Sequence, residues 1–394
     1  MARMMGRGTF VGGAAAATAA AATLPVSAAT QDYGPPLGGT ANIAVIGPFT
    51  GDQIRLGEQV ANGVRAAIDD ANRIHGTLDR VFLLRTYDDQ GTLASALLNA
   101  GFVCDDESML CAIGHLSGRI TEQCLSTYVN AHMPLIVPVS TYDRLTTHGY
   151  ANVLRLPTKD STEGNLAAGS AIAELKPKSA MVFYQDGDYG IDVAAGFHDR
   201  MLREKIESKA IRFAWDKPDY AVVAKLALDA KPDVIYLAGI VKDMGPLVTQ
   251  LKAGGYKGAL YASQGFFDPL TLDKYKADVE GLVVSTSMPP LNLAPSDYRI
   301  RSDFQQKYGP MTPFAAFGYA AGQMAIAAVR RAGAADRIAV ARALGIQSSF
   351  DTCVGTLQFG STGDPIDPNV YFYSVKDAKW AYLRSAHPSS FILK

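Results

Sequence analysis

Residues 109–143 read MLCAIGHLSGRITEQCLSTYVNAHMPLIVPVSTYD and decide the fold. Residues 109–113 are apolar, after which glycine and serine break the run and apolar side chains recur at helical spacing. A second apolar run, residues 133–139, ends in Ser140 and Thr141. This order predicts a strand, a turn, a helix and a second strand, so two neighbouring parallel strands would end at one edge of a sheet.

Small hydroxyl residues follow both of these expected strands. Ser117 comes after the first strand, and Ser140 and Thr141 end the second. Ligands of open α/β sheets bind at this edge, where a helix start offers unpaired N–H groups that attract a carboxylate or amide oxygen. Serine and threonine are also common helix caps. The residues alone therefore leave two interpretations open, a ligand site or simple capping.

The same alternation of strand and helix recurs along the chain. Expected strands at residues 42–46 and 81–87, a helical pattern from Val60 to Ala71 and a helix at residues 92–103 precede the deciding stretch. A second series opens where Asp160 and Glu163 resemble a capping box. Its expected strands are residues 179–184, 210–214, 234–238, 259–262 and 281–286, and its expected helices are residues 193–207, 220–230 and 244–253.

The C-terminal part is expected to contain a long helix at residues 314–332 and a hairpin over residues 357–383 that turns at residues 360–364. The repeated βαβ pattern indicates an α/β fold with doubly wound parallel sheets. A length of 394 residues favours two domains.

Charge argues against nucleic acid as a partner, because 37 Lys and Arg residues balance 38 Asp and Glu residues without a basic stripe. Gly47 and Gly51 follow a strand, but the intervening proline and phenylalanine do not fit a dinucleotide-binding loop. The histidines and cysteines match no metal-site spacing. We therefore expect neither an enzyme nor a cofactor or metal.

Residues 1–29 differ in composition from the rest. Arg3 and Arg7 precede an Ala- and Gly-rich apolar stretch, and Val26, Ser27 and Ala28 offer small residues for cleavage. This pattern is typical of an export signal peptide, although a disordered leader is the alternative and the export route stays open. No cysteine precedes Cys104, so we expect a soluble periplasmic protein without a lipid anchor.

Four cysteines would permit disulfides in that compartment. Cys104 closes an expected helix and Cys111 lies in the next strand, with a short acidic turn between them, so a disulfide joining Cys104 to Cys111 is expected. Cys124 equally suits a small core position.

Several motifs together resemble the periplasmic branched-chain amino acid (Leu/Ile/Val) binding proteins of ABC transporters. They are IAVIGPFTGD (43–52), TYDDQ (86–90), IGHLSG (113–118), MPLIVPVST (133–141), DGDYG (186–190) and GTLQFGSTGD (355–364). The resemblance implies the type I fold of that family, two doubly wound lobes joined by a three-strand hinge that closes on a ligand. Lobe 1 would comprise residues 40–158 and 287–357, and lobe 2 residues 159–286 and 358–394.

The family's ligand positions map onto individual residues of this chain. The resemblance implies ligand contacts from lobe 1 and from the pocket aromatics, at Ser117, Gly118, Val139, Ser140, Thr141, Tyr189 and Phe314. The family's hinge aspartate corresponds to Asp160, which we expect to cap a helix.

Other positions depart from the family. Gln264 stands where the family places a glutamate against the ligand ammonium, and Leu56, Ile240 and Val241 replace aromatic residues. An ammonium buried without a carboxylate would cost several kcal/mol. The resemblance and its departures therefore imply a solute-binding protein for a small apolar carboxylate, amide or amino-acid-like ligand.

The expected partners are this ligand and, transiently, an ABC permease in the inner membrane, and the protein is expected to be a monomer. Two alternatives remain: a bilobal ligand sensor of a signalling system, because receptors share this fold, and a binder of a larger apolar molecule, because the missing aromatics leave room.

The leader generates the first prediction. Export should remove it near Ala28, because small residues at this position suit signal peptidase. Intact-mass analysis of protein from the periplasm measures the N-terminus directly. A mature protein that retains residues 1–28 would contradict the assignment.

Overall fold

Strand β1 (Thr40–Gly47) lies inside the first sheet, between β2 and β3, and is buried along nearly its whole length. A computed structural model describes residues 39–73, 80–186, 189–213, 219–290, 298–345 and 348–391. The expected signal peptide lies outside these residues. An apolar strand flanked by helical segments is typical of a parallel sheet covered on both faces, and this sheet has the order β2-β1-β3-β4-β5 with every pairing parallel.

The first βα series follows the expected order. Its elements after β1 are α1 (Ile54–Arg73), β2 (Val81–Asp88), α2 (Leu93–Asp105), β3 (Met109–Ile113), α3 (Gly118–Asn130), β4 (Leu135–Val137), the 3-10 turn η1 (Asp143–Thr146) and β5 (Val153–Arg155).

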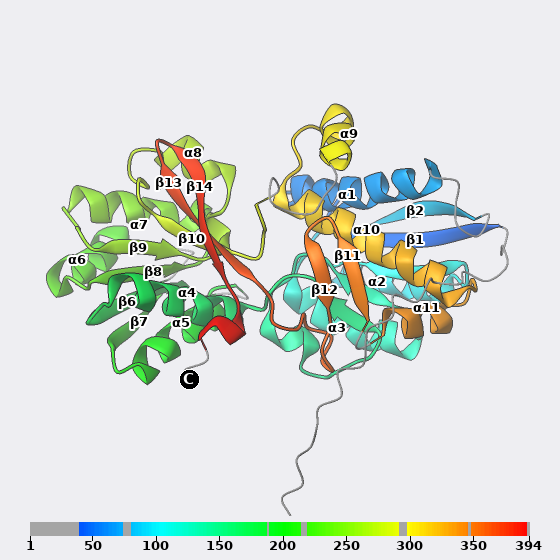
Figure 1. Cartoon of the computed structure of the whole chain (residues 1–394), viewed down its shortest axis with the longest axis horizontal. Coiled ribbons are helices and arrows are strands. Elements are labelled where there is room, and N and C mark those ends of the chain that lie inside the picture. The colour runs from blue at the N-terminus through cyan, green and yellow to red at the C-terminus, as the bar shows by residue number, and fades with distance from the viewer. Residues whose placement is uncertain are drawn as a thin grey trace, which may run out of the picture. The chain divides into compact units, whose positions relative to one another are not determined.

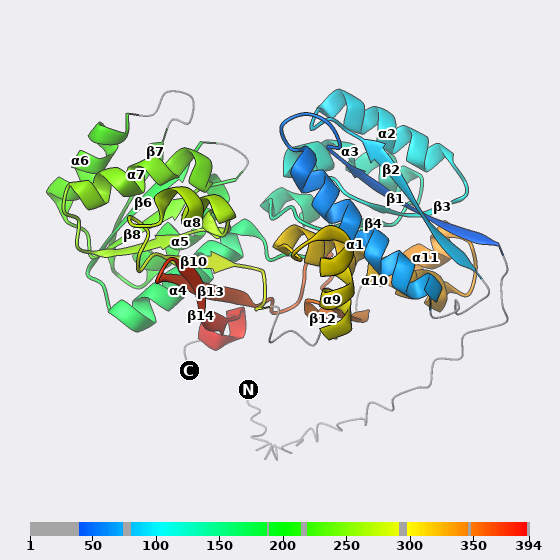
Figure 2. The ribbon, with the colours of Figure 1, turned by 90° about the horizontal axis from the view of Figure 1, so that it is seen from above.

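Alternating side chains of this sheet enter two separate hydrophobic clusters. Ile43 and Val45 of β1 pack with α1 and the long helix α10 (Pro313–Ala332), whereas Ala44 and Ile46 pack with α2 and α3. Figures 1 and 2 show α1 and α10 side by side, an arrangement in which α10 returns to the first sheet from far along the chain. This return of the chain confirms the implied type I arrangement of elements.

The second sheet is larger and mixed, with the order β14-β13-β10-β9-β8-β6-β7. Its elements are α4 (Asp160–Leu175), β6 (Ser179–Gln185), α5 (Ile191–Arg203), β7 (Glu207–Phe213), α6 (Tyr220–Ala230), β8 (Val234–Ala238), α7 (Val241–Ala253), β9 (Ala259–Ala262), η2 (Gln264–Phe266), α8 (Pro269–Tyr275), β10 (Val283–Thr286), β13 (Val370–Lys376), β14 (Lys379–Ala386) and η3 (Pro388–Phe391).

This sheet also has two covered faces. Met181 and Phe183 of β6 pack with α6, α7 and α8, whereas Ala180 and Val182 pack with α4 and α5. Helices α4 and α5 approach closely because Gly164 has no side chain. A Cβ atom at this position would lie only 1.9 Å from the carbonyl oxygen of Val193. The first turn of α4 is thereby held in the interior.

Between β10 and β13 the chain forms α9 (Tyr298–Tyr308), α10, α11 (Arg337–Leu344) and the small hairpin of β11 (Ser349–Thr352) and β12 (Gly355–Gln358). The three segments that connect the two sheets are joined by hydrogen bonds. The N–H of Thr158 donates to the Ser287 hydroxyl at 3.0 Å, and the Thr158 hydroxyl donates to the Asn369 carbonyl at 3.4 Å.

The tail differs from expectation. The C-terminal hairpin pairs β13 with β14 and turns at Asp377 and Ala378, both with positive φ, instead of at residues 360–364. Residues 360–364 do form a turn, closed by the antiparallel bridge between Phe359 and Pro365, but this turn follows β12 and brings Asp364 to β5. Figure 1 shows β13 and β14 beside β10, to which β13 pairs antiparallel.

The expected disulfide is not formed in the structure. Cys104 belongs to the cluster under α2 and α3, whereas Cys111 belongs to the cluster on the opposite face of the sheet. All four cysteines are buried free thiols. The short acidic turn suggested proximity, but the alternation of β3 directs the Cys111 side chain away from Cys104.

No helix among the described residues is long and apolar enough to cross a bilayer.

A buried arginine ties the tail to the first sheet. Arg155 is fully buried at the end of β5, where its guanidinium donates to Asp364 at 2.5 and 2.9 Å, to the Thr146 hydroxyl at 2.7 Å and to the Tyr142 carbonyl at 2.5 Å. These bonds satisfy a charge that would otherwise be too costly to bury.

Arg155→Ala should lower the free energy of unfolding by about 3 kcal/mol, because it leaves Asp364 without its partner. The control is Lys225→Ala, which removes an exposed pair with Asp229 and should cost less than about 1 kcal/mol. Urea denaturation measures both values. If the two variants lose the same free energy of unfolding, burial does not make the Arg155 pair more stabilising than an exposed pair.

Candidate functional site

The hydroxyl residues after β3 and β4 lie together in the structure. Ser117 is the N-cap of α3 and its hydroxyl accepts from the Ile120 N–H at 3.4 Å. A Cβ atom at Gly118 would lie 2.8 Å from the Ser140 hydroxyl and 2.3 Å from the Tyr142 Cβ. Glycine is therefore required at this position, and the close approach brings the start of α3 against the end of β4.

Val139 is half-buried in this region, while Ser140 and Thr141 are nearly buried. The Thr141 carbonyl accepts from the N–H of Asp160 at 2.9 Å, which connects the strand end to the first residue of α4. The N–H of Ser161 donates to the Asp143 carboxylate at 2.9 Å. The first N–H groups of α4 are thus satisfied by Thr141 and Asp143, so the Asp160 carboxylate does not cap the helix as expected.

A second group of predicted residues gathers at the ends of β6, β8 and β9. The Tyr189 hydroxyl accepts from the Gly265 N–H at 3.0 Å, next to Gln264. The backbone of Gly265 in turn lies against Ile240, which is 37% exposed. Val241, in contrast, is buried in the core cluster under α6 and α7, so its side chain faces the interior.

Gln264 is held from both sides. Its side-chain oxygen accepts from the Thr286 hydroxyl at 3.1 Å and from the Ser287 N–H at 3.0 Å, at the end of β10. Its backbone N–H donates to Glu163 Oε1 at 2.8 Å. The Glu163 carboxylate also accepts from the Ser285 hydroxyl at 2.7 Å, instead of returning to the Asp160 N–H as a capping box would.

Two buried carboxyl groups therefore lie beside the candidate ligand residues. Burial raises the pKa of Asp160 well above its usual range. Burial raises the pKa of Glu163 to about 7, although the bonds from Ser285 and Gln264 oppose the shift. Both Asp160 oxygens and Glu163 Oε2 have no hydrogen-bond partner among the described residues.

Leu56 and Phe314 form a third group, at the N-terminal ends of α1 and α10. Both are half-buried, and Phe314 packs against the core cluster of the first sheet. The Thr312 hydroxyl, the N-cap of α10, donates to the Gln59 side chain of α1 at 2.8 Å. The packing of α1 against α10 therefore fixes the positions of both side chains.

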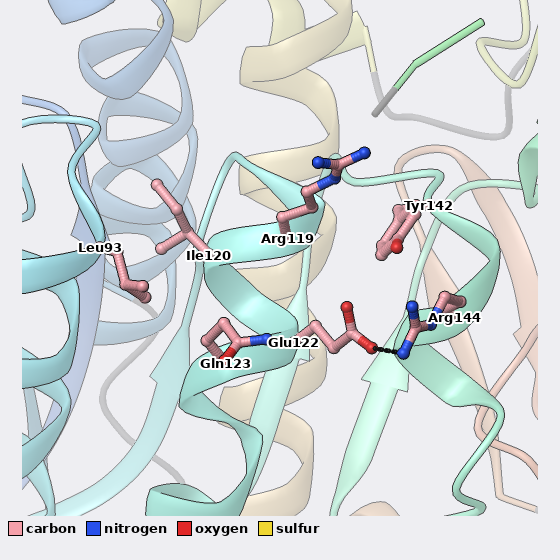
Figure 3. Close-up of a pocket in the computed structure, with 7 residues that line it drawn as sticks. All are labelled: Leu93, Arg119, Ile120, Glu122, Gln123, Tyr142 and Arg144. Atoms are coloured by element: carbon pink, nitrogen blue, oxygen red, sulfur yellow. Dashed lines mark ion pairs between the residues drawn. The ribbon is translucent and has the colours of Figure 1, made fainter. Parts of the chain in front are cut away.

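A surface pocket of about 510 Å³ borders the first group (Figure 3). Its lining residues are Leu93, Arg119, Ile120, Glu122, Gln123, Tyr142 and Arg144. The Arg144 and Glu122 side chains point toward each other in Figure 3 and pair at 2.9 Å. The predicted ligand residues do not line it, although Arg119 and Tyr142 are sequence neighbours of Gly118 and Thr141.

Sequence reasoning missed the residues that hold Gln264. Ser285, Thr286 and Ser287 end β10 in the same way that Ser140 and Thr141 follow β4, so the hydroxyl pattern itself was a usable signal. Glu163 was interpreted only as a helix cap. Within the described residues, no group of three metal-binding side chains gathers, and the site's donors and carboxyl groups suit a small polar head group.

Comparison with known proteins places the chain in a family. The sequence profile described as periplasmic binding protein matches residues 40–379. The chain belongs to the periplasmic binding protein family. This is a family of solute-binding proteins and not of enzymes.

Two relatives illustrate the similarity. A Leu/Ile/Val-binding protein from Rhizobium johnstonii is 26% identical over 86% of this chain and 92% of its own length. A Leu/Ile/Val-binding protein from Citrobacter freundii is 27% identical over 82% of this chain and 87% of its own. A leucine-binding protein from Thermotoga maritima shares the fold, with a TM-score of 0.79 over 89% of this chain and all of the other, at 24% identity.

Thr141→Val should weaken ligand binding by roughly 1–3 kcal/mol, because it removes a nearly buried hydroxyl from the group at the end of β4. Calorimetry with whichever of leucine and 4-methylpentanoate binds the native protein measures the change. Thr147→Val, on the exposed end of the same segment, is the control and should leave affinity unchanged. Unchanged affinity for Thr141→Val would remove this residue from the site.

Proposed function

We propose that this periplasmic binding protein captures a small apolar solute with a carboxylate or amide head and delivers it to an ABC permease. The observation that carries the proposal is the close approach of Gly118 to Ser140, which brings a helix start and the hydroxyls after β4 to one place. Such N–H and hydroxyl groups bind anionic or amide oxygens.

The ligand's second end is proposed to lie near the Tyr189, Gln264 and Ile240 group. Gln264 offers an amide where the family has a carboxylate, so a ligand without a free amine is favoured over a plain amino acid. Relatives include binders of leucine, and a fold neighbour from Rhodopseudomonas palustris is described in complex with benzoate. Leucine and benzoate both carry a carboxylate, which agrees with the proposed head group, and of the two only benzoate lacks an amine.

The proposed lobes are residues 40–158 with 287–357, and residues 159–286 with 358–394. The division into two sheets supports two lobes. The hydrogen bonds that Thr158 makes with Ser287 and Asn369 support the proposal that three chain segments form the hinge. Closure of the lobes on the ligand would bring the groups after β4 and β9 to opposite ends of one molecule.

Export of a soluble monomer, with removal of residues 1–29, completes the proposal. The family description supports a periplasmic location. The permease would be a transient partner that recognises the ligand-loaded protein.

Gln264→Glu tests the charge argument. A glutamate there can still accept from Thr286 and Ser287, but it adds a negative charge beside the ligand. At about pH 6, where most Glu163 carboxyl groups are protonated, native protein should bind 4-methylpentanoate more tightly than leucine, and the variant should reverse this preference, in paired calorimetric titrations.

Gln250→Glu adds the same charge on the exposed surface of α7 and should change neither affinity. Micromolar or tighter binding of leucine to the native protein, about −8 kcal/mol, would show that another group receives the ammonium.

A further inference from the structure

Glu163 occupies an unusual position for a carboxylate. It lies in the first turn of α4 with no exposed surface, directly behind Gln264. Oε1 receives two hydrogen bonds, from the Gln264 N–H and the Ser285 hydroxyl, whereas Oε2 has no partner among the described residues. The neighbouring Gly164 lets α4 pack closely against the α5 backbone.

Within the part of the chain that the structure describes, no positively charged group compensates the charge of Glu163. The titratable groups that face it are Asp160 on the same helix, Tyr189 from the turn before α5 and Tyr236 from β8. The Tyr236 hydroxyl is buried and has no hydrogen-bond partner among the same residues. Asp192 at the start of α5 interacts with Asp143 and Lys159 instead.

We propose that Glu163 is a specificity-determining residue of the ligand site, and that its protonation state decides which ligand charge the site accepts. When Glu163 is neutral, the group around Gln264 accepts a ligand without an amine. When Glu163 is ionised, its negative charge favours a ligand that carries an ammonium group. This inference rests on the proposed function, because it requires ligand to lie against Gln264.

The direction of the effect follows from charge and linkage. An ionised Glu163 repels an anionic ligand and attracts an ammonium group, and the buried surroundings strengthen both interactions. Because burial raises the pKa of Glu163 to about 7, the change of charge falls near neutral pH. Affinity for a monocarboxylate should fall as pH rises through this value, and affinity for a zwitterionic amino acid should rise.

The experiment titrates 4-methylpentanoate and leucine by calorimetry from about pH 6 to 8, a range in which both probes keep their charge. In the native protein the two affinities should change in opposite directions, by up to about tenfold per pH unit because one proton is involved. If only one probe binds, the change of that probe's affinity with pH tests the inference by itself. Titrations in two buffers of different ionisation enthalpy should show uptake of up to one proton with 4-methylpentanoate, which tests the native protein without any substitution.

Glu163→Gln keeps the shape and the acceptor oxygen, and it should flatten both slopes. Glu174→Gln, at the far end of the same helix, is the matched control and should retain them. The inference is overturned if the slopes of affinity against pH persist in Glu163→Gln. It is also overturned if Asp160→Asn abolishes them and Glu163→Gln does not. Binding without any pH dependence also overturns it, whereas failure of both probes to bind at every pH contradicts the proposed ligand class itself.

Discussion

Strands that are buried on both faces impose the constraint on which the rest of this structure depends. Ile43 and Ala44 of β1 enter different clusters, and Val182 and Phe183 of β6 do the same, so each sheet needs helices above and below. A chain satisfies this by alternating strand and helix. The carboxyl ends of the strands of each sheet then meet at one edge of that sheet, which is where the groups of candidate ligand residues after β4 and after β9 lie.

The first turn of α4 joins these two groups. Its N–H groups are satisfied by Thr141 and Asp143, which come from the first sheet's side of the chain. The carboxylates of Asp160 and Glu163 are therefore not needed as caps, and Glu163 instead contacts the backbone of Gln264. The first turn of α4 therefore does more than begin the helix. It places the carboxyl groups of Asp160 and Glu163 between the residues expected to contact the two ends of a ligand.

Sequence patterns predicted most of the fold because local signals agreed with it. β8, β9 and α6 begin and end at the expected residues, where apolar runs meet turn-forming residues. The tail turn was wrong because Asp377 and Ala378 adopt positive φ without the glycine or asparagine that usually marks such a turn. The disulfide and the role of Glu163 depended on which face a side chain takes and on contacts distant in sequence, which spacing does not encode. Strand order predicted which of the named residues lie near one another, except that Val241 enters the core, and their contacts with ligand stay a prediction.

The burial of the four thiols has a practical consequence for labelling chemistry. Burial raises the pKa of Cys104 to about 11 and of Cys124 and Cys353 to about 12, and it raises the pKa of Cys111 further. Thiolates are the reactive species, so at neutral pH these residues react slowly with maleimides and other alkylating dyes. A single cysteine introduced at an exposed position would carry a fluorophore selectively, without removal of the native residues, and a binding protein labelled in this way becomes an optical reporter for its own solute.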